Sequence, residues 1–569
     1  MGAGKHSLLA NDAREPREWL SERLSKVLLA VVVTGAAMLA AYWAFLTPIY
    51  QAPDEPINLD YALAIYENGG LFRVRHTSYF QLPPFVHPYT RYLLERLEHH
   101  RVTFHNDQRM PPGYGTLAFF RDLEQHAPSR QGLHFERPNQ PAAVYPFGYY
   151  ALVAVWIGFL HLFDDGPVFT FFGVRLLSVL MLIASLLLIH ATLRRSHFRR
   201  FPALCVTASI AYFPLTLFVA SAVQMDNLTF LLVSAVFYLA VRARQELKSL
   251  SPSQWTASLS WIITGLGFAL AALLVTKVHF FLCVAAPVYL MLLTELGFAR
   301  VGFCRWSQSA LLLLVPSLLS GSIYLWTIWG TSILHFSNPQ RGDNVVVHTL
   351  QWFLAACADF YAGLTHRSFW GIFGWMDTPI RIRGGNTNEA IRITILLIGW
   401  CVLALTLLRL EQVVSRLVRL ARKGKKNVAW RLAVSDVMMN SYIVFTIFMI
   451  YLFIRVENRF HAQGRNWLPL ILPIFLTGIR FAPKALTLRP SQWAMKWGVI
   501  AGLLLYDVVG GYYSLQTIKK RFYATKQETA VFQALEPSRL PRTGLSIRAE
   551  LGEISHRSTF RQNKCTMPP

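Results

Sequence analysis

The apolar residues of this chain fall into many separate blocks, with polar or basic residues between them. A helix needs about 20 apolar residues to cross the roughly 30 Å hydrocarbon core of a membrane. Eleven blocks are long enough, and they cover residues 27–48, 169–193, 201–221, 226–243, 258–275, 278–296, 308–329, 390–409, 437–455, 465–482 and 494–515. The pattern therefore predicts an all-α polytopic membrane protein with about 11 transmembrane helices.

A twelfth apolar block, 143–163, is ambiguous because it contains Pro146 and Gly148 and is followed by Asp164 and Asp165. Cytoplasmic loops collect Lys and Arg, so charge decides whether this block spans the membrane. If it does not span, 21 basic residues fall in cytoplasmic loops and four in the short outer connections. We therefore expect 143–163 to be an interfacial helix on the outer surface.

This topology divides the chain into seven parts with long outer loops. They are a cytoplasmic N-terminus 1–26, a first transmembrane helix 27–48, an outer loop 49–168 with interfacial helices, a transmembrane core 169–329, a second long outer loop 330–389, C-terminal transmembrane helices 390–515, and an outer tail 516–569. The two loops are longer than a connection requires, and long loops are often functional. The outer face is thus where a functional site is expected.

Composition agrees with a membrane protein, since 53% of the residues are hydrophobic and only 15% are charged, against about a quarter in soluble proteins. The net charge of +24 would suggest nucleic acid binding in a soluble chain. Here 21 of the 55 basic residues lie in predicted cytoplasmic loops, where they serve orientation, so no nucleic acid partner is expected. The six cysteines include no CxxC pair, which argues against a disulfide or metal framework. Walker A, HExxH and GxSxG signatures in a suitable context are missing from the sequence.

Two groups of carboxylates stand at predicted outer ends of spans. Asp54 and Glu55 follow the first span and are flanked by prolines, which would hold a catalytic group in a fixed pose, although the segment also reads as a turn that ends the helix. Asp226 and Asn227 lie at a junction of two apolar blocks with hardly any loop between them. An ionisable group there is costly unless it faces a polar cavity or a partner, and a helix N-cap is the alternative.

A few cations stand on the side that is otherwise poor in basic residues. Lys277 interrupts a long apolar stretch at an outer turn, and Arg175 lies near the outer start of the second span. Each side chain either extends to the lipid headgroups or holds an anionic ligand. Arg465 belongs to an outer turn with three arginines, for which a lipid-linked phosphate is a suitable partner.

Aromatic residues are concentrated in the second long outer loop. Trp370 and Trp375 alternate with glycines, and Asp377 and Arg383 follow them. Such aromatics are typical of an interfacial belt, and the same residues would suit a surface that stacks sugars and binds a phosphate. Tyr145, in the twelfth block, is a further candidate for the wall of such a pocket.

In the order and spacing of these residues, the chain resembles the GT-C superfamily of integral-membrane glycosyltransferases up to about residue 480. The likeness is greatest to the aminoarabinose transferase and protein mannosyltransferase branch, through a bacterial subfamily with a Pro-Asp-Glu-Pro signature, here residues 53–56. Such proteins have an acidic residue after the first span, then interfacial helices, then an Arg at the second span. In this chain these correspond to Asp54 with Glu55, block 143–163 and Arg175. A second carboxylate and a Thr-Lys pair follow at later outer turns, matched by Asp226 and by 276–277.

The resemblance implies transfer of a sugar from a polyprenyl-phosphate carrier to a cell-envelope acceptor, such as lipopolysaccharide, another surface glycan or a protein. It also implies a bacterial inner-membrane location with the active site facing the periplasm. In this hypothesis the transfer inverts the anomeric centre, Asp54 is the general base with Glu55 as the alternate, and Asp226 orients the acceptor or shares the role of base. A lipid-linked glycan polymerase or ligase, and a flippase or secondary transporter, are the alternatives.

One departure from the family pattern affects the expected phosphate site. The aminoarabinose transferase branch has a lysine just before its interfacial helix, whereas residues 139–142 here read Asn-Gln-Pro-Ala. We therefore expect Lys277, Arg383 and Arg465 to bind the carrier phosphate. No cofactor is required by this chemistry, and a divalent cation bound by Asp54 and Asp226 is left open, as are the sugar, the acceptor and the oligomeric state.

Overall fold

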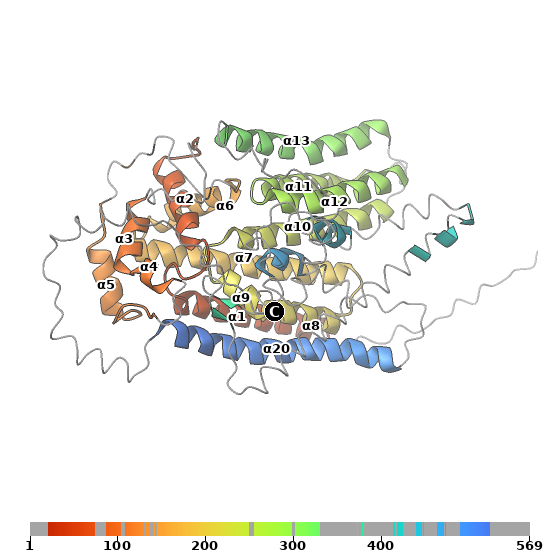
Figure 1. Cartoon of the computed structure of the whole chain (residues 1–569). Coiled ribbons are helices and arrows are strands. Elements are labelled where there is room, and N and C mark those ends of the chain that lie inside the picture. The colour runs from red at the N-terminus through yellow and green to blue at the C-terminus, as the bar shows by residue number, and fades with distance from the viewer. Residues whose placement is uncertain are drawn as a thin grey trace, which may run out of the picture. The chain divides into compact units, whose positions relative to one another are not determined.

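Long helices make up most of the described part of the computed structural model (Figure 1). The structure describes residues 21–73, 87–103, 108–129, 133, 135, 142, 145–249, 255–298, 302–329, 372–373, 378–379, 414–415, 418–420, 422–424, 440–446, 448, 464–471, 473 and 490–523. Within these ranges six helices are long and apolar enough to cross a membrane. They are α1 (Glu22–Leu46), α7 (Pro167–Arg195), α10 (Met225–Ser249), α11 (Ala257–Leu274), α12 (Val278–Phe298) and α13 (Phe303–Thr327). The prediction of a polytopic, all-helical membrane protein is confirmed.

The predicted span 201–221 is a broken one. It consists of α8 (Arg200–Ala211) and α9 (Pro214–Ala220), which are bent by 60° relative to each other. Pro214 explains the break, because proline has no backbone N–H to donate and its ring clashes with the preceding turn of a helix. The block is long enough for one straight helix, and its proline divides it.

Several short helices gather at one end of the long ones (Figure 1). They are α2 (Glu55–Glu67), α3 (Pro88–Arg96), α4 (His99–Val102), α5 (Leu117–Gln125) and α6 (Gly148–Leu160). The 13 residues of α6 extend about 20 Å at 1.5 Å per residue, which is less than the hydrocarbon thickness. The side of the membrane on which this end lies stays a prediction.

The last long helix, α20 (Pro490–Phe522), extends beyond the predicted span 494–515. Arg521 is buried near its end and donates to the backbone oxygens of Gln108 and Val102, each at 2.8 Å. The amide of Met110 donates in turn to the carbonyl of Phe522 at 3.0 Å. The first residues of the predicted tail 516–569 therefore belong to a helix that is tied to the first outer loop. Residues 523–569 form a separate unit and, apart from 523, lie outside the described residues.

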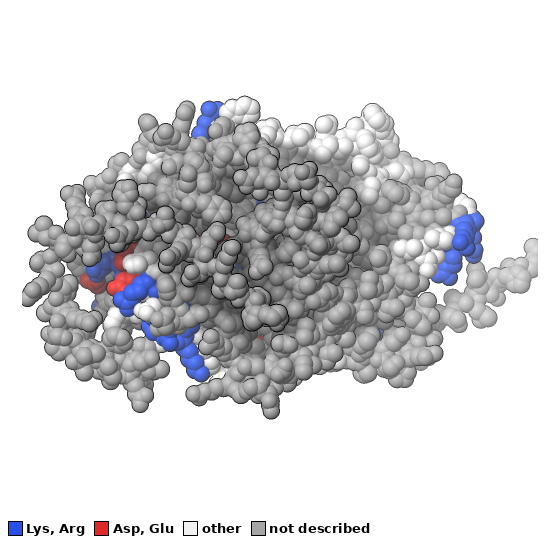
Figure 2. All heavy atoms as spheres, viewed as in Figure 1, with Lys and Arg blue, Asp and Glu red and all other residues white. Residues whose placement is uncertain are grey.

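The remaining described pieces are short. β1 (Ile372–Phe373) and β2 (Thr378–Pro379) form an antiparallel pair within the second long loop, and η4 (Gly464–Leu470) is a 3₁₀ helix at the start of predicted span 465–482. Predicted spans 390–409 and 437–455 lie wholly or largely outside the described residues. On the face drawn in Figure 2, the described charged side chains gather towards the two ends of the molecule, as expected when apolar surface faces lipid between two aqueous sides.

Candidate functional site

Asp54 stands at the N-terminus of α2 in a left-handed backbone conformation, with φ 63° and ψ 0°. Aspartate tolerates this region better than most residues, yet it still costs about 1 kcal/mol. The carboxylate makes no cap hydrogen bond to its own helix. Its Oδ2 instead accepts from Nη2 of Arg465, in η4, at 2.5 Å. The backbone of this turn is thus held in a strained form that presents the Asp54 side chain to a distant part of the chain.

Asp226 and Lys277 complete a row of alternating charges with this pair. The Lys277 Nζ lies 2.5 Å from Asp226 Oδ1, and the Arg465 Nε lies 4.0 Å from Asp226 Oδ2. The exposed fraction of the side chain falls along the row, from 22% for Asp54 and 15% for Arg465 to 5% for Asp226 and Lys277. Two carboxylates and two cations balance, so the row is neutral overall and only its Asp54 end is open.

Tyr145 lies close enough to this row to interact electrostatically with its charged side chains. Burial raises the pKa of its phenol to about 12, with the Asp54 and Asp226 carboxylates adding to the effect and Arg465 opposing it. The phenol is therefore neutral at ordinary pH and can donate a hydrogen bond. Tyr145 thus adds an uncharged donor to the row, within the part of the chain that the structure describes.

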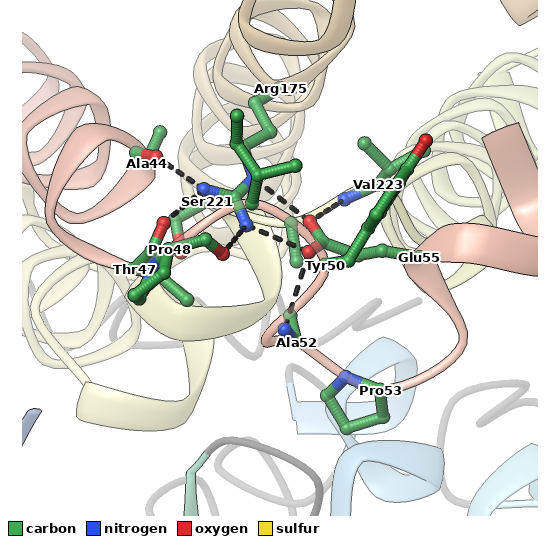
Figure 3. A network of polar contacts seen from close by, with 12 residues as sticks. Ala44, Thr47, Pro48, Tyr50, Ala52, Pro53, Glu55, Arg175, Ser221 and Val223 are labelled. Carbon is green, nitrogen blue, oxygen red and sulfur yellow. Dashed lines mark hydrogen bonds and ion pairs between the residues drawn. The ribbon is translucent and has the colours of Figure 1, made fainter. Parts of the chain in front are cut away.

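Glu55 forms a second, fully buried ion pair with Arg175 of α7 (Figure 3). The guanidinium binds both carboxylate oxygens, with Nε 2.9 Å from Oε1 and Nη2 2.7 Å from Oε2. The remaining donors of Arg175 bind the last carbonyls of α1 and the residues after it, those of Ala44, Thr47 and Pro48. Neither side chain has exposed surface. The pair fastens the end of α1 and the start of α2 to α7.

The turn that precedes Asp226 is bound to the same region. Glu55 Oε1 accepts from the amide of Val223 at 3.0 Å, and Gln224 Nε2 donates to the carbonyl of Pro53 at 2.9 Å. Asn58 of α2 donates to the carbonyl of Val223 at 2.9 Å. These bonds tie residues 53–58 to residues 223–224. Because Asp54 belongs to the first segment and Asp226 follows the second, the two carboxylates are brought close together.

The turn that carries Lys277 is positioned by the start of α6. The amide of Gly148 donates to the carbonyl of Val275 at 2.5 Å. A Cβ at position 148 would lie 2.7 Å from that same oxygen, so only glycine permits this approach. Helix α6 therefore packs directly on the turn, and Tyr145 precedes this contact by three residues.

The sequence matches the family described as "Predicted membrane protein (DUF2142)" over residues 38–472. The chain belongs to this family. The match includes Asp54, Asp226, Lys277 and Arg465. No curated protein matches the chain.

Among solved structures, the chain is similar to the oligosaccharyltransferase of Archaeoglobus fulgidus. With an acceptor peptide tethered, that structure gives a TM-score of 0.40 at 10% identity, covering 90% of this chain and 57% of that one. In complex with an inhibitory peptide and a dolichol-phosphate it gives 0.37 at 11% identity, covering 91% and 60%. This DUF2142 chain thus spans less than two thirds of the length of the archaeal enzyme.

Three expected site residues of this family member have other partners. Glu55 accepts from four donors: the amides of Ala52 and Val223 and two nitrogens of Arg175. The side chain of Arg175, like that of Glu55, has no exposed surface. The side-chain nitrogen of Asn227 donates to the carbonyls of Val219 and Ala222 at 2.9 and 3.0 Å, so it caps the end of α9. In this structure all three side chains are engaged in contacts within the protein, and their roles in the reaction stay predictions.

The remaining expected residues come from the second long loop. Trp370, Trp375, Asp377 and Arg383 lie outside the described residues. The described part of the chain contains no cluster of three or more His, Cys, Asp or Glu residues that could hold a metal ion. There, Asp54 and Asp226 each face a cationic side chain.

Sequence reasoning missed the residues that hold the turns together. Gln224 stands two positions before Asp226, so the short polar stretch around that aspartate carried a signal for it. Asn58 carried a weaker signal, a single amide in the apolar helix α2. In the sequence, Gly148 only made block 143–163 ambiguous. Its close contact with the carbonyl of Val275, more than 120 residues further along the chain, could not be predicted.

Proposed function

We propose that the protein is a membrane glycosyltransferase that moves a sugar from a polyprenyl-phosphate carrier to a cell-envelope acceptor. The observation that carries this proposal is the convergence of Asp54 and Asp226 on Arg465, with Lys277 behind them. A carboxylate with an open edge beside two cations suits a reaction in which a proton is removed and a phosphate departs. The resemblance in residue order to GT-C glycosyltransferases supports the same reaction class.

In the resting site Asp54 is bound by Arg465 and is not free to act as a base. We infer that the phosphate of the donor takes over the guanidinium, since phosphate accepts two hydrogen bonds from arginine as a carboxylate does. Donor binding would thereby release Asp54 when the reaction needs it. The exposed edge of Asp54 makes it, rather than Asp226, the carboxylate that meets the acceptor.

The chemical step is then a single displacement. Asp54 accepts the proton of an acceptor hydroxyl, and the hydroxyl oxygen forms a bond to the anomeric carbon while the bond from that carbon to the phosphate oxygen breaks. The electron pair leaves with the polyprenyl phosphate, whose growing negative charge Arg465 and Lys277 stabilise. Attack opposite to the leaving group inverts the anomeric centre. No nucleotide sugar is needed, because the carrier supplies the activated bond.

The other residues of the proposal have supporting roles. Asp226 holds Lys277 and orients Arg465. Tyr145 donates a hydrogen bond to the sugar or the acceptor. Trp370, Trp375, Asp377 and Arg383 are proposed to cover the donor sugar and its phosphate from the second long loop. The site would face the periplasm at the bacterial inner membrane, in keeping with the expected charge distribution.

The test is transfer activity of an Asp54→Asn protein with a polyprenyl-phosphate sugar in membranes. Asparagine keeps the shape and removes the base, so we expect the rate to fall by about 10²- to 10⁴-fold. Asp122→Asn is the matched control, since Asp122 is also an ion-paired aspartate of the first loop but is half exposed and pairs with Arg96. The control should retain normal transfer. A folded Asp54→Asn protein with normal activity would refute the proposed base.

The product distinguishes the proposal from its enzymatic rival. A glycosyltransferase of this kind adds one sugar unit, whereas a polymerase or ligase transfers a lipid-linked chain. Mass analysis of the product should therefore show a single-residue increment. Transfer of an intact oligosaccharide would assign the same site to the rival class.

A further inference from the structure

Asp507 is a carboxylate in the middle of α20 that the proposed reaction does not use. Its side chain is 4% exposed, and neither oxygen has a hydrogen-bond partner. Fifteen helical residues follow it and 17 precede it, so it lies more than about 20 Å from either end of the helix at 1.5 Å per residue. That depth corresponds to the interior of the membrane rather than to either surface.

The carboxylate lies on the face of α20 that packs against the protein. Leu503, Tyr506 and Ser514 are buried with it, whereas Val508 and Tyr512 point outward and are largely exposed. The residue is therefore directed into the helix bundle and not towards lipid. An ionisable group placed in this way within a membrane helix is a functional candidate by default.

The part of the bundle that Asp507 meets is the break between α8 and α9. The ring of Tyr506, its neighbour, lies 5.9 Å from that of Phe213. One turn further along, a Cβ on Gly510 would lie 3.4 Å from Cγ of Pro214. Helix α20 packs against both α8 and α9. Asp507 thus stands beside the 60° bend.

The bend supplies oxygen atoms that lack donors. Because Pro214 has no N–H, the carbonyl of Ile210 receives no hydrogen bond of the usual helical kind. The hydroxyls of Ser209, in α8, and Thr216, in α9, are buried without a partner. In secondary transporters, the carbonyls freed at such a break coordinate Na⁺ or H⁺.

No charged side chain is available to neutralise Asp507 from the described elements packed on it. Residues 201–211 of α8, all of α9 and β2 contain no Lys, Arg, His, Asp or Glu, and the charged residues of α1 stand in its first turns, at 22, 23 and 26. The titratable groups of residues 201–220 are the thiol of Cys205 and the phenol of Tyr212, and Tyr506 adjoins Asp507 in α20. An unpaired carboxylate in such surroundings carries a large free-energy cost, which a bound proton removes.

We propose that Asp507 and the α8–α9 break form an intramembrane proton-binding site, in which Asp507 is a neutral carboxylic acid. Neither Asp507 oxygen is hydrogen-bonded in this structure, and the free oxygens of the neighbouring break are the acceptors that its O–H would take. Loss of the proton would place a negative charge at the C-terminal end of α8, where the helix dipole is also negative. Helix α9, only seven residues long, joins this site to the turn that binds Glu55 and Pro53.

The decisive experiment is infrared difference spectroscopy of the full-length protein in membranes at about pH 7. Wild type minus Asp507→Asn should show the C=O stretch of a protonated carboxylic acid, because only a neutral acid absorbs there. Asp507→Glu should retain a band of this kind, displaced in frequency. Asp507→Asn keeps the size of the side chain, and a folded protein can be verified by its elution as a single species. The absence of the difference band would overturn the proposal.

Carbodiimide labelling provides an independent readout on the wild-type chain, since a carbodiimide reacts with the acid form of a carboxyl group. We expect a lipid-soluble carbodiimide to modify Asp507, and modification to decline as the pH is raised. A water-soluble carbodiimide should reach Asp122, whose side chain is 46% exposed, and not Asp507. Protection of Asp507 by Na⁺ but not by K⁺ would show a sodium site instead and would refute a site for protons.

Discussion

Glu55 and Arg175 form a bidentate ion pair in which neither side chain has exposed surface, although 120 positions separate them in the sequence. The pair stands immediately beside Asp54, whose carboxylate points the other way, to Arg465. Two adjacent acidic residues therefore have opposite roles. Glu55 is fully buried in an ion pair that joins helices, whereas Asp54 lies at the open end of the charged row.

Replacement of Glu55 by Gln should destabilise the protein strongly. It leaves the buried guanidinium of Arg175 without its counter-charge, which typically costs about 3 to 5 kcal/mol. Thermal unfolding in detergent measures the loss. Glu98→Gln is the control, because Glu98 pairs with Arg101 at an exposed position and should matter by less than about 1 kcal/mol. If the Glu55→Gln protein is inactive but as stable to heat as wild type, Glu55 takes part in the reaction and not mainly in folding.

The Lys277–Asp226 pair should separate stability from activity. Lys277→Met removes the nearer counter-charge of the buried Asp226 and leaves only Arg465, 4.0 Å away, so we expect a loss of up to about 3 kcal/mol together with loss of transfer. The double variant Asp226→Asn/Lys277→Met removes both charges and should recover most of the stability but none of the activity. Lys26→Met, which breaks an exposed pair with Glu22, should change neither property. Transfer by the stable double variant would exclude the pair from the reaction.

His99 should make the first outer loop sensitive to acid. Burial lowers the pKa of its imidazole from the ordinary 6.5 to about 4, with the hydrogen bond to the Tyr50 carbonyl opposing the effect. The unfolded chain therefore binds the proton more readily than the folded one, and stability falls as the pH is lowered from about 6.5 towards 4.

The measurement is the unfolding midpoint of wild type and His99→Gln at several pH values within that window. The variant should lose less stability on acidification than wild type does. His126→Gln, at a largely exposed side chain, should behave like wild type. Equal acid sensitivity in wild type and His99→Gln would show that other groups bind the protons.

The helices were predictable because their apolar blocks are long and are separated by basic residues. The structure reproduces predicted spans 27–48, 169–193 and 258–275 closely as α1, α7 and α11. The break in 201–221 was harder to predict. The length and hydropathy of that block fit one span, and a proline inside a membrane helix does not always break it: α12 and α13 each contain one and remain single helices.

The sequence predicted which residues belong to the candidate site better than it predicted what each of them does. Asp54, Asp226 and Lys277 are polar residues at ends of apolar blocks, and the structure brings them together with Arg465. The sequence could not tell Asp54 from Glu55, since the distinction depends on a left-handed turn and on an arginine 120 positions away. Asp507 escaped notice because one carboxylate hardly alters the apolar character of a long block.

Arg521 binds the first outer loop although it lies several hundred positions further along the chain. The carbonyls of Val102 and Gln108 that it binds precede it by 419 and 413 positions. Counted from Gln108, the chain must grow by 413 residues, about seven-tenths of its 569, before that guanidinium exists. Asp54 likewise waits 411 positions for Arg465. The charged row can therefore assemble only after residue 465 has been synthesised, and a chain that stops before this residue would lack an intact row.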